Sequence, residues 1–159
     1  MRDHLVEFAG KIADIQDVRQ IERSTDPSGT TRIVNEWRVH QQIPAAIRSM
    51  LKIDALGWID RNTWNDAAKT CTWTIEPSFL RENITCSGQT LFAEGMGGHG
   101  TRVTFTGELD IKPGLIGSLG AIETMVIGFI ESIVTTIIPS NLRAVIEAAA
   151  AFELPADRI

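Results

Sequence analysis

A long apolar stripe with helical spacing near the C-terminus is the feature that most constrains the fold of this chain. From Ala121 onward, apolar side chains recur with a period of about 3.6 residues. They are Ile122, Met125, Val126, Phe129, Ile130, Ile133, Ile137, Val145, Ala148 and Phe152, and the stripe is widened by Ile127, Val134, Ile138 and Leu142. A stripe this wide predicts a helix buried on more than one side. Pro139 lies inside the pattern and predicts a kink near Ile138.

The composition is that of an ordinary globular domain, and it excludes several classes of protein. The 159 residues are 43% hydrophobic and 22% charged, and the net charge is −5. This acidity argues against nucleic acid and anionic membranes as partners, because both require a basic surface. The most apolar run, Met125 to Ile138, is about a third shorter than the ~20 residues of a membrane span, and Glu131 interrupts it. We therefore expect no integral membrane segment, no secretory signal and a cytoplasmic location.

The middle of the chain alternates like an antiparallel sheet. After a short helix to about Ala9, the expected strands are Val18–Arg23, Thr30–His40, Leu56–Trp64, Cys71–Glu76, Asn83–Phe92 and Thr101–Ile111, with a short helix over Ala45–Lys52. In the last strand Val103, Phe105, Leu109 and Ile111 share one face, which predicts one buried and one wet face. A loop over 113–120 leads to the long helix. We expect one α+β domain over residues 1–159, in which the helix covers an antiparallel sheet.

Several segments together form a recognisable pattern. They are Ile43-Pro44 with Ile47-Arg48, Trp64 in DRNTW, and Gly100-Thr101-Arg102 with GELDIKPGLIGSLGAIE. With them the chain resembles the START-like superfamily of polyketide cyclases, dehydrases and lipid-transport proteins. Within it, the chain is most similar to bacterial proteins of unknown function grouped as DUF2505. The resemblance implies a helix-grip fold, a curved sheet around the C-terminal helix, with a cavity for a small hydrophobic molecule. Family members begin with a strand not matched here, so either the true start lies upstream or the edge strand is lost. An open edge favours self-association, with a homodimer as a further expectation.

Candidate cavity residues come from the apolar faces of the expected strands and helix, together with polar residues that interrupt those faces. They are Asn35, Trp37, Trp58, Trp73, Phe105, Met125, Phe129 and Ile133. Indole rings offer flat apolar walls and an N–H donor, but each can equally fill a core. Asn35, Asp60 and Asn62 either orient a ligand or, if the face assignment is off by one residue, point into solvent.

No catalytic or metal-binding pattern emerges from the remaining reactive residues. His4, His40 and His99 are far apart and lack metal-ligand spacing, so neither a metal nor another cofactor is expected. Cys71 and Cys86 are candidates for cross-strand neighbours. They could form a redox pair, but we favour the alternative that they are two buried reduced thiols.

Three functions follow from these patterns. We expect a non-enzymatic protein that binds a lipid-like or aromatic molecule. The alternatives are a cyclase- or dehydratase-type enzyme and an interaction module with a filled core. The enzyme would need at least two polar groups inside the cavity, drawn from Asn35, Asp60, Asn62, Arg61 and Glu131.

Overall fold

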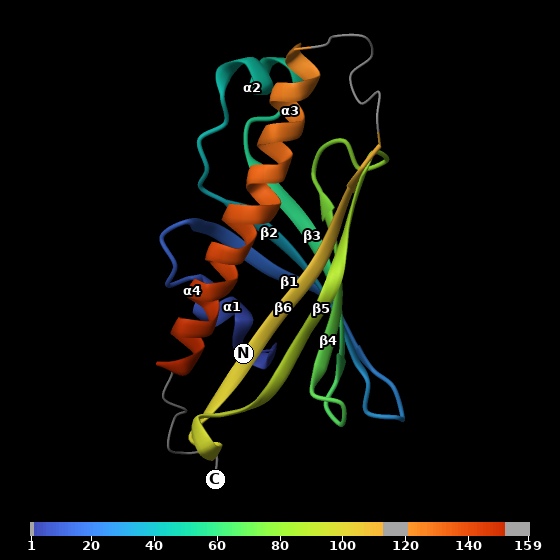
Figure 1. The fold of residues 1–159 in the computed structure, drawn as a ribbon, viewed down its shortest axis with the longest axis vertical. Helices are drawn as coiled ribbons and strands as arrows, with labels where there is room; N and C mark the ends of the chain where they lie inside the picture. Colours follow the sequence, from blue (N-terminus) through green and yellow to red (C-terminus); the bar gives the residue numbers. More distant parts are fainter. Residues whose placement is uncertain (1, 113–120, 152–159) are drawn as a thin grey trace.

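The fold is an α+β arrangement in which one long helix lies against one face of a six-stranded antiparallel sheet (Figure 1). The computed structural model describes residues 2–112 and 121–151. The expected loop over 113–120 and Phe152 lie outside the described residues. The helices of the N-terminal half are a 3₁₀ turn at Arg2–His4, α1 (Leu5–Ala9) and α2 (Ala45–Leu51).

The sheet is a meander whose strands follow one another in sequence order, from β1 to β6. The strands are β1 (Ile15–Thr25), β2 (Thr31–Val39), β3 (Leu56–Asn65), β4 (Thr70–Pro77), β5 (Ile84–Gly95) and β6 (Gly100–Ile111). Short turns join most neighbours, which is why every pairing is antiparallel. The predicted strands are therefore confirmed, with ends that differ by a few residues. The sheet is open, with β1 and β6 as its edges.

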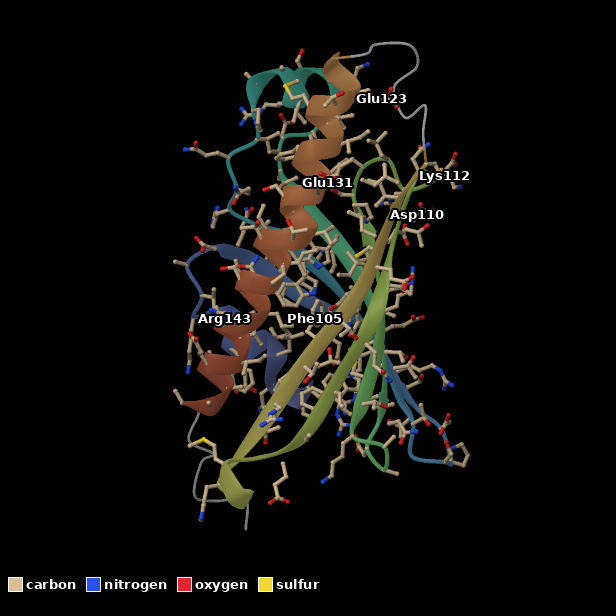
Figure 2. The ribbon with its side chains drawn as sticks, viewed as in Figure 1. Phe105, Asp110, Lys112, Glu123, Glu131 and Arg143 are labelled. Atoms are coloured by element: carbon tan, nitrogen blue, oxygen red, sulfur yellow. The ribbon has the colours of Figure 1, made fainter. Side chains whose placement is uncertain are left out.

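The two faces of the sheet differ in burial, as the alternation predicts. On β6, Phe105 and Leu109 are half-buried, whereas their neighbours in the sequence, Thr104 and Asp110, are exposed. Figure 2 shows Phe105 on the helix side of β6 and Asp110 on the opposite side. On β2, Asn35 and Trp37 are both buried. The side chains that share the face of Trp37 therefore lie beneath the helix.

The long helix is continuous, but it contains one wide turn. It comprises α3 (Ala121–Ser132), a π-helical turn (Ile133–Ile137) and α4 (Ile138–Ala150). At the end of the π turn, the N–H of Ile138 donates to the carbonyl of Ile133, five residues back. Pro139 follows directly and has no N–H to donate, so the irregularity lies in the turn before the proline.

The π turn changes which residues face the sheet. Val126, Ile130 and Ile133 form the buried stripe before it, and the next buried residue is Ile138, five positions after Ile133. One extra residue in the turn rotates everything that follows by about 100°. The stripe then continues through Asn141 and Val145.

The helix is buried along one face, which corrects the expectation that it is buried on more than one side. Val126 is 0% exposed, whereas the adjacent Met125 is 40% exposed. The opposite face, which includes Glu131, Thr135 and Arg143, is exposed. An open sheet offers one surface only, and α1 adds contacts to α4 at one end. The extra apolar residues of the stripe therefore remain half-exposed.

The helix is longer than the apolar run indicated. With α3, the π turn and α4 it runs from Ala121 to Ala150, because the π turn lets it continue through Pro139. By length and composition it is the one helix among the described residues that could cross a membrane. The apolar run Met125–Ile138 therefore understates the length of the helix, and the absence of an integral membrane segment stays a prediction. In this structure its buried stripe packs on the core, with Val126, Ile130 and Val145 in the same apolar cluster as strand residues Trp37 and Trp58.

The free edge at β1 is irregular and charged. Its pairing with β2 shifts register between Ile15 and Asp17 and again between Gln20 and Glu22. All of its residues except Ile15 and Val18 are exposed. Bulges and exposed charges discourage another strand from pairing with an edge. Within the described residues, only the 3₁₀ turn and α1 precede this strand.

Candidate functional site

A cavity of about 110 Å³ lies between α4 and the face of the sheet that the helix covers. Residues from five strands, from α4 and from the N-terminal turn and helix line it. They are Arg2, Leu5, Ile33, Asn35, Trp37, Trp58, Asp60, Asn62, Trp64, Cys71, Trp73, Ile75, Thr90, Phe105, Ile138, Asn141, Leu142 and Val145. A second, smaller void of about 30 Å³ lies nearer α3, and Trp58, Ile75 and Ile138 line both.

Two stacked aromatic pairs form the flat walls of the larger cavity. The rings of Trp37 and Trp58, which are direct cross-strand partners, lie 5.8 Å apart at an angle of 18°. The rings of Trp73 and Phe105 lie 4.5 Å apart at 7°. Parallel aromatic walls favour a planar apolar ligand, because they match its shape and exclude water.

Two glycines make room for the indole of Trp73. Gly88 on β5 and Gly107 on β6 are direct partners in the sheet, and Gly88 also pairs with Trp73. A Cβ on Gly107 would lie 2.4 Å from Cη2 of Trp73, and a Cβ on Gly88 would lie 2.4 Å from its Cζ2. The indole therefore lies across the bare backbone of two neighbouring strands.

Asp60 is the acidic group of the cavity, and its carboxylate is already hydrogen-bonded. Its Oδ1 accepts from the backbone N–H of Asn35 at 3.1 Å, and its Oδ2 accepts from the indole N–H of Trp37 at 3.0 Å. Burial raises the pKa of Asp60 from its ordinary value. Hydrogen bonds from the side chains of Asn62 and Asn35 partly oppose this shift in pKa.

The thiol of Cys71 lies beside this polar cluster. It donates a long hydrogen bond of 3.6 Å to Oδ1 of Asn62. Burial raises the pKa of Cys71 to about 12, and the charge of Asp60 adds to the shift. A thiol that stays protonated is neither a nucleophile nor a metal ligand at neutral pH.

The two cysteines are not cross-strand neighbours, which corrects that expectation. Cys71 pairs with Thr90, and Cys86 pairs with Ile75. The register is displaced because the chain between β4 and β5 leaves the sheet at Pro77 and returns only at Ile84. Both cysteines are free and buried, as the favoured interpretation held.

Two hydrogen-bond donors in the cavity have no acceptor among the described residues. The indole N–H of Trp73 and the side-chain NH₂ of Asn141 are both buried and unpartnered. Trp73 is 7% exposed and Asn141 is 5% exposed. A buried donor without an acceptor costs about 1–3 kcal/mol, so this pair is a notable feature of the cavity.

Arg2 contributes the basic group of the cavity, and acidic residues hold it. Its guanidinium lies 5.9 Å from the ring of Trp64. Nη1 donates to Asp66 at 2.8 Å, and Nε contacts Asp3 at 3.2 Å. The positive charge of Arg2 is therefore largely compensated within the protein.

The structure brings most of the sequence-derived candidates together. Asn35, Trp37, Trp58, Trp73 and Phe105 all line the larger cavity, and so do Asp60 and Asn62. The alternative that places the polar residues in solvent is therefore wrong.

Three candidates from the helix do not line the larger cavity. Met125 is exposed and Phe129 is half-buried, because both lie beside the buried stripe of α3. Ile133 lines the smaller void instead. Of the polar groups suggested for an enzyme, Arg61 and Glu131 are both exposed. The suggested groups that do line the larger cavity are Asn35, Asp60 and Asn62.

Asn141 is the functional candidate that the sequence pattern does not reveal. It lies between Ser140 and Leu142 without a motif, and it faces the cavity only because of the π turn. Among the described residues, no group of three or more His, Cys, Asp or Glu side chains could hold a metal ion. No family model matches the sequence, and no curated protein matches it either.

Proposed function

We propose that this chain is a START-like protein that binds a small hydrophobic molecule in the cavity between the sheet and α4. The observation that carries the proposal is the cavity itself, about 110 Å³ in volume and walled by two stacked aromatic pairs beneath the long helix. An apolar pocket with a few convergent polar groups is the usual form of a small-molecule site. The cavity also favours binding over an interaction module with a filled core.

A cavity-filling variant tests this proposal. Leu142 is half-buried and lines the cavity, so Leu142→Trp should fill the space that a ligand needs. Leu91→Trp is the matched control, because Leu91 is 44% exposed and does not line the cavity. Calorimetric titration with ethylbenzene, naphthalene and 1-dodecanol should show binding of at least one probe to wild type and L91W, and none to L142W. Failure of all three probes to bind wild type would overturn the proposal, and so would equal binding to L142W.

One observation favours enzymatic chemistry of the cyclase or dehydratase type as a second candidate. Asp60, Asn35 and Asn62 converge in the cavity, and burial raises the pKa of the carboxyl group. A carboxylate in such a site is suited to general acid–base catalysis. In D₂O, the Asp60 carboxylate would take a proton from the methyl group of acetophenone to give the enolate. The carboxyl proton would exchange with the solvent, and a deuteron would then return to the same carbon. Proton NMR should then show faster loss of the methyl signal with wild type than with Asp60→Asn, whereas equal rates would exclude this chemistry for the ketone.

A further inference from the structure

The two unpartnered donors lie on opposite walls of one cavity. Trp73 belongs to β4 in the sheet, and Asn141 belongs to α4 above it. Both side chains are more than nine-tenths buried. Burial of two donors without acceptors weakens the unliganded protein, and an acceptor atom in the cavity would remove that cost.

The acceptors in the cavity are better supplied with partners than the donors. Both carboxylate oxygens of Asp60 accept hydrogen bonds, from the N–H of Asn35 and the indole of Trp37. The amide oxygen of Asn62 accepts from the thiol of Cys71. A ligand donor would therefore meet acceptors that already have partners, whereas a ligand acceptor would meet two donors that have no partner among the described residues.

The volume of the cavity restricts the size of the ligand. An engineered protein cavity of about 150 Å³ holds one benzene molecule, so a space of about 110 Å³ is on the scale of a single ring. The parallel rings of Trp73 and Phe105 add a flat surface for such a ring. A long acyl chain exceeds this volume.

The charges in and beside the cavity argue against an anionic ligand. Asp60 lies in the cavity, and a ligand carboxylate close to it would be repelled. Arg2 does not offset this repulsion, because Asp3 and Asp66 already engage its guanidinium.

We infer that the cavity takes an uncharged, ring-sized aromatic molecule whose polar group is a carbonyl-type acceptor, held by the indole N–H of Trp73 and the amide of Asn141. This inference rests on the proposed binding function and narrows its ligand class. Hydrophobic walls supply most of the affinity for such a molecule. The two donors supply selectivity, because an isosteric ligand without an acceptor leaves them unpaired.

Four probes of nearly equal size separate the contributions that apolar contact, an acceptor group and a charge make to the binding affinity. Ethylbenzene is apolar, acetophenone carries the acceptor, benzoate is an anion and 1-phenylethylamine is a cation. In calorimetric titrations of wild type, acetophenone should bind about tenfold more tightly than ethylbenzene, which corresponds to two hydrogen bonds of modest net strength. Benzoate and the amine should bind more weakly than acetophenone. In ¹H–¹⁵N NMR spectra, acetophenone should shift the indole N–H signal of Trp73 downfield.

Variants at the two donors complete the test. Asn141→Leu and Trp73→Phe should each reduce the preference for acetophenone over ethylbenzene, and the double variant should abolish it. Retained binding of ethylbenzene shows that each variant is folded and keeps its cavity. Equal binding of acetophenone and ethylbenzene to wild type would overturn the inference and leave the proposed function intact, as would tightest binding of the amine. Failure of all four probes to bind wild type would overturn both the inference and the binding of ring-sized molecules.

Discussion

The indole N–H of Trp37 on β2 donates a 3.0 Å hydrogen bond to Oδ2 of Asp60 on β3. The two residues lie on neighbouring strands, two positions apart in register, because Asp60 pairs with Asn35 and Trp37 pairs with Trp58. The hydrogen bond holds the indole in its stack with Trp58 and places a carboxyl group between aromatic walls. The hydrogen bond between Trp37 and Asp60 therefore positions both an aromatic wall of the cavity and its acidic group.

Asp60 should make stability fall as pH rises above about 4. Burial raises the pKa of Asp60 in the folded protein, whereas in the unfolded chain it titrates near 3.9. Between these two values the folded state binds more protons, so its stability decreases with pH and then levels off above the raised pKa. Asp60→Asn removes this dependence. Urea denaturation at several pH values should show wild type losing stability relative to D60N as the pH rises from 4 to 8.

Asp110→Asn is the control for net charge. Asp110 is exposed on the outer face of β6, so D110N removes a carboxylate without touching the cavity (Figure 2). An effect of net charge alone appears in both variants. A difference between wild type and D60N that stays flat or grows with pH would contradict the raised pKa of Asp60.

The close contact between Gly107 and Trp73 should make Gly107→Ala destabilising. The added Cβ would lie 2.4 Å from Cη2 of the indole, and it would also approach the carbonyl of Ser87 at 3.0 Å. We expect a loss of about 1–3 kcal/mol in the free energy of unfolding, typical of overpacking. The single ring of phenylalanine has no counterpart of Cζ2 and Cη2 of the indole. In a Trp73→Phe background, G107A should therefore lower the free energy of unfolding by less. A double-mutant cycle in urea measures this coupling.

Gly128→Ala is the matched glycine substitution. Gly128 is exposed on α3, and a Cβ there would meet nothing within 4 Å. Alanine is the better helix former, so G128A should add about 1 kcal/mol of stability. If G107A were as stable as G128A, or if W73F did not reduce its cost, the indole would not lie across the two glycines.

Both cysteines should resist thiol reagents in the folded protein. Burial raises the pKa of Cys71 to about 12 and also raises the pKa of Cys86. At pH 8 few thiolates form, and the buried sulfur atoms are inaccessible. Ellman's reagent should therefore report almost no free thiol in native protein and two per chain in denaturant. Rapid labelling of native protein at the denatured rate would contradict this burial.

The strands and the long helix follow from local patterns, so the sequence predicts them well. The alternation that places Phe105 and Leu109 on one face is confirmed, and so is the helical period through Val126 and Ile130. Polar residues on tryptophan-bearing faces, such as Asp60, also fall in the cavity. These features depend only on the periodicity of strands and helices.

The sequence pattern does not predict how one element is rotated relative to another, and so it does not predict which side chains of the long helix face the cavity. Met125 is exposed because it lies just beside the buried stripe of α3. Asn141 is buried because an unpredicted π turn rotates α4 relative to α3. Gly107 did carry a signal, since it interrupts the alternation between Phe105 and Leu109. A glycine inside a strand often marks a close approach, here by a ring from β4.

Asn141→Leu should stabilise the unliganded protein while it weakens ligand selectivity. The NH₂ of Asn141 is buried without an acceptor among the described residues, and leucine has the same branched skeleton as asparagine, although its methyl groups make it larger. Replacing an unsatisfied amide with an apolar side chain should raise the free energy of unfolding by about 1–3 kcal/mol. Asn35→Leu is the control, because Asn35 is equally buried but its side chain hydrogen-bonds Asp60. N35L should therefore destabilise the protein. Urea titrations in the absence of ligand compare the two, and a loss of stability in N141L as large as in N35L would mean that the amide of Asn141 has a partner inside the protein.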